Sequence, residues 1–327
     1  MPRRLAAAEE RWPLAGAFVI SRGTKTEAHV VVAALAEAGL VGRGECTPYE
    51  RYDETPASVL AQIAGVRGEM EAGCDREALQ ALLPPGAARN ALDCALWDLE
   101  AKLTGVRAWA RAGRVRLDPV KTAYTLSLDT AERMAQAAAR AARRPMLKLK
   151  LGAEGDLERV KAVREAAPRT RLIVDANEGW DFQTLQGLAP ELAGLDIKLI
   201  EQPLPAGEDA VLEGYDCPVL LGADESLHSR AELAACARRY GCVNIKLDKA
   251  GGLTEALALA AAARQRGLGI MIGSMVATSL SMAPALILAQ GADFVDLDGP
   301  LLLAHDRAPG LGYLGSMIEP SRPELWG

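Results

Sequence analysis

The sequence is poor in the residues from which several common functional sites are built. Only 4% of the 327 residues are aromatic, and the three histidines lie too far apart to form an HxH or HExxH metal motif. The six cysteines are scattered without a CxxC or CxxH spacing, which argues against zinc ligands and against a disulfide framework. Their scatter favours reduced, buried thiols and therefore a cytoplasmic protein.

The chain also lacks an excess of basic charge and an uninterrupted apolar segment. Its net charge of −6 argues against nucleic acid as the main partner. No apolar core precedes Glu9 and Glu10, so we expect no secretion signal. Residues 267–292 carry no charge, but glycines, serines and a proline interrupt them. This pattern predicts a buried strand at Gly269–Gly273 and a buried helix after it, and no membrane span.

The N-terminal part of the chain has the pattern of strands followed by helices. Residues 12–45 resemble a strand meander with a polar loop at Ser21–Thr26. Apolar residues at helical spacing then predict an amphipathic helix at Ala88–Leu103. Strands followed by helices, without alternation, predict an α+β module over residues 1–115.

From residue 116 to about residue 300, apolar runs alternate with alanine- and arginine-rich helical stretches. Eight strands and about seven helices in alternation predict an α/β fold, a modified (β/α)7β TIM-type barrel. The predicted strands are 120–126, 146–151, 171–175, 197–201, 218–224, 242–247, 269–273 and 293–298.

Charged and hydroxyl side chains stand at the ends of these runs. In a barrel, the carboxyl ends of all strands meet at one rim, where active sites lie. Most of these side chains follow one another at steps of about one strand and one helix. The sequence therefore predicts one site assembled from Lys150, Asp175, Glu201, Asp224, Lys246, Ser274, Asp296 and Asp298.

Asp175, Glu201 and Asp224 close three successive strands of the predicted barrel. Unpaired carboxylates that meet at one rim repel one another, which raises one or more of their pKa values. A divalent cation removes this repulsion, and an all-oxygen set of ligands with open positions suits Mg²⁺. The alternative is that the carboxylates pair with Lys150 and Lys246, and both arrangements can coexist.

Lys148 and Lys150 alternate with leucines, so both side chains leave the same face of a strand. Taken alone, this pair fits an edge strand with its lysines in water. Lys246, however, comes from the sixth strand, nearly opposite Lys150 in an eight-stranded ring. Two amines on either side of a metal ion suit 1,1-proton transfer, in which one removes an α-proton and the other returns a proton to the opposite face. The nearby charge of Lys148 favours the neutral amine that a base requires, so we assign Lys148 to the catalytic set as well.

Asp296 and Asp298 place two carboxylates on one face of the last strand. These residues can act as strand-end caps or as salt-bridge partners. The functional interpretation is a pocket for a cationic group of the substrate, such as a free ammonium.

Five short motifs carry a family resemblance: Lys148-Leu-Lys150, Val174-Asp-Ala-Asn177, Glu201-Gln-Pro203, Ala223-Asp-Glu-Ser226, and the run from Asn244 to Gly252. Together they resemble the enolase superfamily, in its muconate-lactonising subgroup, over essentially the whole chain. The resemblance implies a capping domain at 1–115, a catalytic barrel at 116–300, and a C-terminal segment at 301–327 that packs back on the capping domain.

Within that subgroup, Gly273-Ser-Met275 and Asp296-Leu-Asp298-Gly-Pro300 are similar to motifs of dipeptide epimerases of the L-Ala-D/L-Glu type. This similarity implies a Mg²⁺-dependent isomerase in peptidoglycan recycling. Its small-molecule substrate would be a dipeptide, epimerised at the α-carbon of its C-terminal residue. Whether the chain forms a homo-oligomer stays open.

The same resemblance implies particular substrate contacts. Asp296 and Asp298 would hold the substrate ammonium, and Lys148 would touch its carboxylate. Thr125 and Ser274 would also contact the substrate. The loop around residues 21–26 would close over it, so that either Arg22 or Lys25 meets an acidic side chain.

Three alternatives compete with this interpretation. An o-succinylbenzoate synthase or an N-acylamino-acid racemase shares the fold, but its substrate has no free ammonium for Asp296 and Asp298 to hold. A non-catalytic ligand-binding barrel would not need both Lys150 and Lys246. A dinucleotide site at Gly310–Gly315, which matches GxGxxG, fails because no predicted strand precedes it and Pro320 blocks a following helix.

Overall fold

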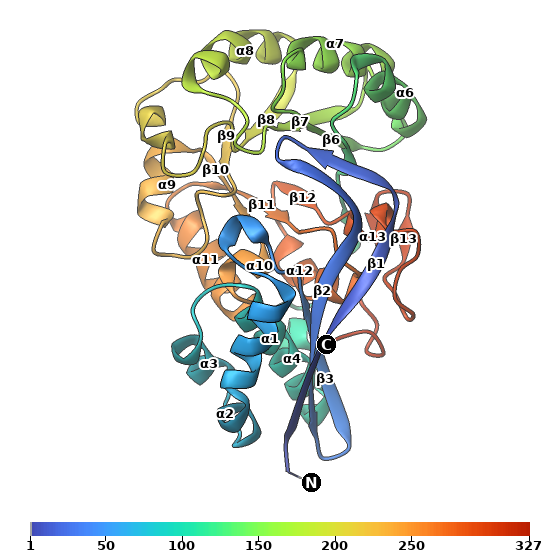
Figure 1. Ribbon diagram of the computed structural model, residues 1–327, viewed down its shortest axis with the longest axis vertical. Coiled ribbons are helices and arrows are strands. Elements are labelled where there is room, and N and C mark those ends of the chain that lie inside the picture. Colours follow the sequence, from blue (N-terminus) through green and yellow to red (C-terminus); the bar gives the residue numbers. More distant parts are fainter. Residues whose placement is uncertain (1) are drawn as a thin grey trace.

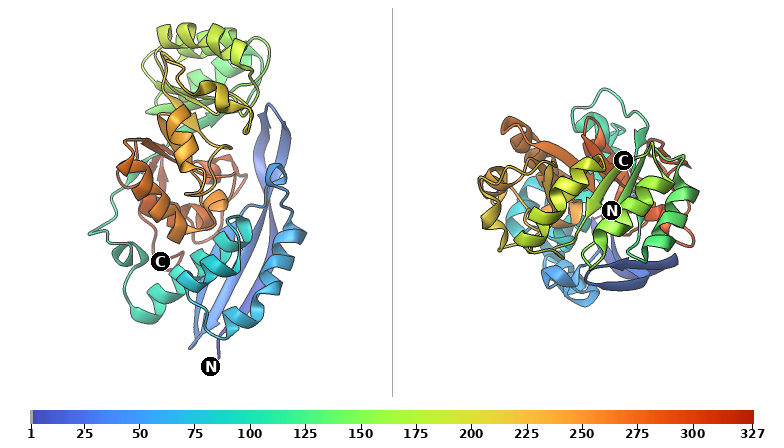
Figure 2. Two further views of the ribbon diagram at one scale, coloured as in Figure 1. Left: turned by 90° about the vertical axis from the view of Figure 1, so that its left-hand side faces the viewer. Right: turned by 90° about the horizontal axis from the view of Figure 1, so that it is seen from above.

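The structure is a computed structural model that describes residues 2–327 (Figure 1). Its first three strands, β1 (Arg4–Ile20), β2 (Gly23–Glu37) and β3 (Leu40–Cys46), form an antiparallel sheet in that order. Figure 2 shows this sheet standing beside the barrel that the later part of the chain forms. The tip of the β1–β2 hairpin reaches toward the barrel.

The hairpin is longer and its turn tighter than the sequence pattern predicts. The expected polar loop at Ser21–Thr26 is wrong in extent, because Thr24 and Lys25 pair with Val19 and Phe18 as part of β2. Strand β1 also begins at Arg4, before the predicted strand region. Residues 4–11 are rich in alanine and glutamate, which favour helices, but pairing with the apolar β2 overrides that preference.

Helix α4 (Ala87–Thr104) covers one face of this sheet and confirms the predicted helix at Ala88–Leu103. It approaches β3 closely, because a Cβ atom at Gly44 would lie 2.1 Å from the carbonyl oxygen of Ala91. The remaining elements of this part are η1 (Glu50–Tyr52), α1 (Pro56–Gly65), α2 (Arg67–Glu71), α3 (Arg76–Leu82) and α5 (Ala108–Arg111).

Eight parallel strands form the barrel, in the order β12-β11-β10-β9-β8-β7-β6-β5. The backbone N–H of Ala123 donates to the carbonyl of Val295 over 2.8 Å and joins the two ends of the sheet. The predicted (β/α)7β barrel with an N-terminal α+β capping domain is thereby confirmed. The strands are β5 (Tyr124–Leu126), β6 (Met146–Lys150), β7 (Arg171–Asp175), β8 (Ile197–Glu201), β9 (Leu221–Ala223), β10 (Cys242–Ile245), β11 (Gly269–Gly273) and β12 (Phe294–Asp296).

Helices connect the strands around the outside of the barrel (Figure 1). Every residue of α12 is buried, which confirms the buried helix predicted after Gly273. Within residues 2–327, no helix is both long enough and apolar enough to cross a membrane. The connecting elements are α6 (Ala131–Ala141), α7 (Asp156–Ala166), α8 (Phe182–Gly194), η2 (Asp209–Leu212), α9 (Leu233–Arg239), α10 (Leu247–Ala250), α11 (Leu253–Gln265), α12 (Ser279–Ala289) and α13 (Gly299–Leu302).

The alternation of side chains along each strand positions the functional site. One buried cluster joins Met146, Ile173, Leu199 and residues from other barrel strands. Two residues further along these three strands stand Lys148, Asp175 and Glu201, which share the same face because a strand has period two. An apolar layer therefore lies beneath a charged one.

The C-terminal segment returns to the capping domain. Strands β13 (Tyr313–Leu314) and β14 (Met317–Ile318) first form a small sheet with β4 (Val120–Lys121). The indole of Trp326 then donates to the carbonyl of Cys94 over 3.0 Å. The contact of Trp326 is the one expected of a tail that packs back on the capping domain, while the bounds at residues 115 and 300 stay a prediction.

The close contact at Gly44 leads to a stability prediction. Gly44→Ala should lower the free energy of unfolding by about 1–3 kcal/mol, because the new methyl group has no room beside α4. Urea unfolding followed by circular dichroism measures the change. Gly16→Ala is the matched control, since no atom lies within 4 Å of a Cβ at Gly16. Equal stability of both variants would contradict the packing argument.

Candidate active site

Three buried carboxylates gather at the carboxyl ends of neighbouring strands. Asp175 and Glu201 end β7 and β8, and Asp224 follows β9. The backbones of Asp175 and Glu201 are paired in register, and one oxygen from each of the three carboxylates lies within 4.8 Å of the others. The structure thus brings together the three residues predicted to bind a metal ion.

Lysine side chains approach these carboxylates from both sides of the triad. Lys150 on β6 donates to Asp175 over 2.6 Å, and Lys246, which follows β10, donates to Asp224 over 2.6 Å. Strands β7, β8 and β9 lie between the two lysine-bearing strands. The ammonium of Lys148 lies 2.7 Å from Glu201 and donates to Asp296 over 2.7 Å. Both predicted arrangements, a carboxylate triad and lysine pairing, therefore occur at one rim.

The formal charges of this buried cluster do not balance. Six carboxylates face four ammonium groups and the guanidinium of Arg22, which pairs with Glu225, so negative charge is still in excess. The carboxylates belong to Asp175, Glu201, Asp224, Glu225, Asp296 and Asp298, and the ammonium groups to Lys148, Lys150, Lys246 and Lys249. A bound metal cation would offset this excess.

Among the three carboxylates of the triad, Glu201 is the one whose pKa is raised. Burial and the neighbouring Asp175 raise the pKa of Glu201 to about 8. Burial also opposes the charge of Asp175, but Lys150 and Lys148 lower its pKa below the usual range. Against burial, Lys246 and Lys249 likewise lower the pKa of Asp224. A cation bound among the three carboxylates would favour the ionised form of Glu201. Because all the donors are oxygens, Mg²⁺ suits the site.

A cavity of about 720 Å³ lies between the capping domain and this rim. Its walls include both predicted bases and all of the predicted substrate contacts. From that set the lining includes Arg22, Thr125, Lys148, Lys150, Lys246, Ser274, Asp296 and Asp298.

The two aspartates near the end of β12 lie side by side in this cavity. The backbone N–H of Thr125 donates to Asp298 over 2.6 Å, while Asp296 has one buried oxygen without a hydrogen-bond partner. Burial and the neighbouring Asp296 raise the pKa of Asp298 to about 7. A cationic group bound between the two carboxylates would relieve this repulsion.

Arg22 reaches the rim from the turn between β1 and β2, but its guanidinium is already engaged. It forms salt bridges with Glu178 over 2.9 Å and with Glu225 over 2.7 Å. Lys25 also lines the cavity, with its ammonium 4.9 Å from the centre of the Tyr49 ring. Among residues 2–327, no carboxylate forms a salt bridge with Lys25.

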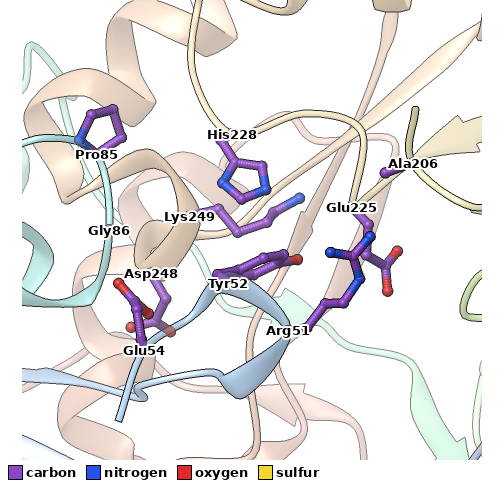
Figure 3. A pocket seen from close by; sticks show the side chains of 10 residues that line it. All are labelled: Arg51, Tyr52, Glu54, Pro85, Gly86, Ala206, Glu225, His228, Asp248 and Lys249. Atoms are coloured by element: carbon purple, nitrogen blue, oxygen red, sulfur yellow. The ribbon is translucent and has the colours of Figure 1, made fainter. Parts of the chain in front are cut away.

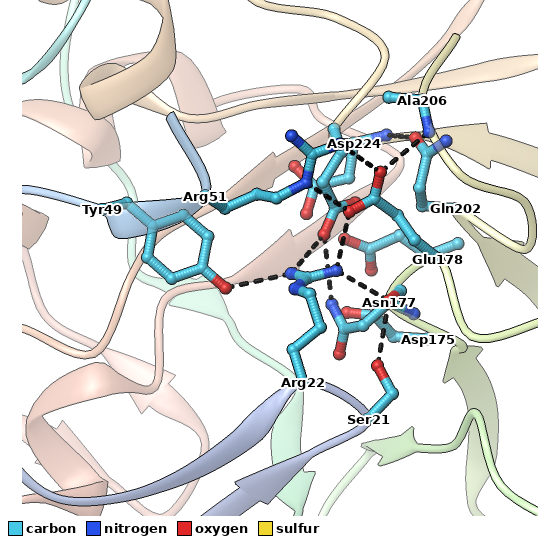
Figure 4. A network of polar contacts seen from close by, with 12 residues as sticks. Ser21, Arg22, Tyr49, Arg51, Asp175, Asn177, Glu178, Gln202, Ala206 and Asp224 are labelled. Carbon is cyan, nitrogen blue, oxygen red and sulfur yellow. Dashed lines mark hydrogen bonds and ion pairs between the residues drawn. The ribbon is translucent and has the colours of Figure 1, made fainter. Parts of the chain in front are cut away.

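Three further side chains support the carboxylates, although the sequence pattern assigns them no role. Asn244 donates to Glu201 over 2.7 Å, and Lys249 donates to Asp224 over 2.6 Å. Gln202 accepts the backbone N–H of Asp224 over 2.8 Å (Figure 4). Asn244 stands two positions before Lys246, so strand periodicity could have revealed it. Gln202 is the middle residue of the Glu201-Gln-Pro203 motif, but strand periodicity does not mark it, since it points to the opposite face from Glu201.

A second cavity of about 330 Å³ adjoins the first, with Tyr52 and Glu225 in the walls of both. Figure 3 shows His228 and Lys249 beside Tyr52, with Glu54 and Asp248 close together. The rings of Tyr52 and His228 meet edge to face at 4.4 Å between their centres. Polar side chains thus continue from the rim toward the capping domain.

Two relatives of known activity are similar in sequence over nearly the whole chain. An L-Ala-D/L-Glu epimerase from Escherichia coli is 48% identical, over 95% of this chain and 98% of its own length. An N-acetyl-D-glutamate racemase from Pseudoalteromonas sp. is 42% identical, over 91% of this chain and 95% of its own length.

Solved structures agree with these sequence relatives. An enolase family member from Agrobacterium tumefaciens, with bound sodium and L-Ala-L-Glu, superposes with a TM-score of 0.98 at 52% identity and full coverage of both chains. A dipeptide epimerase from Methylococcus capsulatus, complexed with Mg and L-Arg-D-Lys, gives a TM-score of 0.90 at 31% identity over 98% of each chain.

Family matches cover both parts of the fold. Residues 3–110 match the mandelate racemase / muconate lactonizing enzyme N-terminal domain, and residues 130–309 match the enolase C-terminal domain-like family. Because the matches, the fold and the strand-end residues agree, the chain belongs to the enolase superfamily, in its mandelate racemase and muconate-lactonising group.

Proposed function

We propose that this protein is a Mg²⁺-dependent isomerase that epimerises the α-carbon of the C-terminal residue of a dipeptide. The substrate that we propose is L-Ala-D/L-Glu, from murein peptides. One observation carries the proposal: Lys150 and Lys246 flank the carboxylate triad and line the same cavity as Asp296 and Asp298. The 48% identical epimerase from E. coli supports the choice of substrate.

The two lysines would exchange the α-proton across the substrate carbon. Lys150, from β6, takes the proton from one face, and Lys246, after β10, returns one to the other face, so the configuration inverts. In the reverse direction the roles exchange. Lys148, between Glu201 and Asp296, would contact the substrate carboxylate.

Asp175, Glu201 and Asp224 would hold the magnesium ion. When bound, the ion would stabilise the negative charge that develops on the substrate carboxylate as the α-proton leaves. The chain's contribution is to hold three oxygen ligands in a buried position. Asn244 and Gln202 fix two of them by hydrogen bonds to Glu201 and to the backbone of Asp224.

Asp296 and Asp298 would hold the N-terminal ammonium of the dipeptide, with Thr125 and Ser274 beside them in the cavity wall. A racemase of N-acetylated amino acids is the second candidate, because one relative at 42% identity has such an activity. An N-acetyl group carries no charge, however, and would leave the repulsion between the two aspartates in place. The paired carboxylates therefore favour the dipeptide.

Lys25 is the cation that we assign to the acidic side chain of the substrate. Its ammonium lines the cavity over the ring of Tyr49, and no carboxylate of residues 2–327 forms a salt bridge with it. Arg22, the other candidate, is neutralised by Glu178 and Glu225.

We also propose that the protein works in the cytoplasm. All six cysteines are free thiols in the structure, and Cys46, Cys94, Cys236 and Cys242 are buried, as is usual for the reduced thiols of a cytoplasmic protein. Cytoplasmic recycling of peptidoglycan fragments would supply the dipeptide.

The first functional prediction concerns the two proposed bases. Lys150→Ala and Lys246→Ala should each lower the rate of epimerisation of L-Ala-L-Glu by about 10²–10⁴-fold or more, because each removes one of the two proton carriers. Proton NMR in D₂O measures both exchange and inversion at the α-carbon. Lys161→Ala, an exposed lysine on α7, is the control. Full turnover by either base variant would disprove the two-base mechanism.

The second concerns the ammonium pocket. Asp298→Asn should lower kcat/KM for L-Ala-L-Glu by roughly 10–100-fold, the loss expected for one charge-assisted hydrogen bond. Turnover of N-acetyl-L-glutamate, which has no ammonium, should change much less. Steady-state kinetics with both substrates decides the matter. An equal loss for both would mean that Asp298 does not recognise the ammonium.

The third concerns the metal site. In protein freed of metal, added Mg²⁺ should raise the Tm of the wild type as its concentration increases, because it binds the folded state. Glu201→Gln should remove most of this rise, whereas Glu191→Gln, an exposed glutamate on α8, should keep it. Thermal unfolding followed by circular dichroism provides the measurement. A rise of normal size in Glu201→Gln would exclude Glu201 as a ligand.

A further inference from the structure

The turn between β1 and β2 is fastened to the barrel through the side chain of Arg22. Nη1 donates to the carbonyl of Asn177 over 2.6 Å and to Glu178 over 2.9 Å. Nη2 donates to the hydroxyl of Tyr49 over 2.9 Å and to Glu225 over 2.7 Å. Figure 4 shows the guanidinium among these groups, with Ser21 also bonded to Asn177. Each terminal nitrogen therefore serves two acceptors and has no N–H left for a ligand.

Glu178 is the anchor for this guanidinium. Its side chain is only 6% exposed, and its other partners hold it from two more segments. Arg51 of η1 donates to both carboxylate oxygens over 2.8 Å, and the backbone N–H of Ala206, after β8, donates over 2.8 Å (Figure 4). The carboxylate that receives Arg22 is thus also held by groups outside the β1–β2 turn.

The acceptors of Arg22 are close neighbours of the proposed metal ligands. Asn177 and Glu178 follow Asp175 on the same loop, and Glu225 directly follows Asp224. Asn177 and Glu178 have φ angles of 46° and 66°, a conformation that non-glycine residues keep only where their surroundings hold them in it. The hydrogen bonds of Ser21 and Arg22 to the carbonyl of Asn177 are part of those surroundings.

We propose that Arg22 is a positioning residue that latches the β1–β2 turn over the cavity and couples this closure to the loops that carry Asp175 and Asp224. Arg22 would then act without touching the substrate. Turning Arg22 from Glu225 to a substrate carboxylate would take away the salt bridge of a buried carboxylate, which is strongly unfavourable. The kinetic part of the test rests on the proposed epimerase function, and the exchange part does not.

The kinetic test compares two substrates of the same shape, L-Ala-L-Glu and its neutral isostere L-Ala-L-Gln. Arg22→Ala should lower kcat/KM for both by the same factor, at least tenfold, with the loss mainly in kcat. Arg22→Lys should restore part of it, because an ammonium can pair with one of the two carboxylates. Arg4→Ala, which removes an exposed salt bridge on the same strand, is the matched control and should behave as the wild type. A loss confined to L-Ala-L-Glu, or no loss for either substrate, would overturn the latch.

The second test uses hydrogen–deuterium exchange and needs no substrate. Backbone amides of residues 20–26 should exchange at least tenfold faster in Arg22→Ala than in the wild type or in Arg4→Ala. Added Mg²⁺ should slow this exchange in the wild type and not in Arg22→Ala, because coupling between two sites is reciprocal. Unchanged exchange in Arg22→Ala, or the same Mg²⁺ effect in both proteins, would refute the coupling. A wild type inactive on both dipeptides would refute the proposed function alone.

Discussion

An ionised carboxylate inside a protein needs a partner of opposite charge. The rim of this barrel holds six buried carboxylates. Four lysines compensate part of the charge, and their side chains come from β6, from the end of β10 and from α10. The strands around the triad must stay in register for these pairs to meet, as Lys150 and Asp175 do. The remaining negative charge is the reason that the site suits a metal cation, and it is also the basis on which we propose a cationic substrate group beside Asp296.

The capping domain closes the other side of the same charged space. Its contribution depends on a long hairpin, whose turn brings Ser21 and Arg22 to the loops after β7 and β9. Helix α4 holds the base of that hairpin sheet through the close approach at Gly44. The N-terminal sheet is therefore held by packing against α4 at Gly44 and by the salt bridges of Arg22 at the β1–β2 turn. The position of the turn depends on both.

The barrel and the triad could be predicted from the sequence because their signals are local. The alternation of lysine and leucine placed Lys148 and Lys150 on the same face of one strand. Asp175 and Glu201 were recognised because each is the acidic residue that ends an apolar run. The partners of Arg22 could not be found in this way, because Glu178 and Glu225 lie more than 150 residues away in the chain. The length of β1 was also missed, since residues 4–11 favour a helix in isolation and become a strand only by pairing with β2. Tertiary contacts decided both points.

The tail of the chain has a consequence for the order in which the protein can be assembled. The indole of Trp326 is buried against α4 and bonds to Cys94, 232 positions earlier. The core between α4 and the N-terminal sheet uses only residues of the capping domain, whereas the face of α4 with Cys94 and Trp97 packs against the barrel and the tail, which leave the ribosome later. Until those residues are synthesised, this face of α4 is an exposed apolar surface of the kind that chaperones protect.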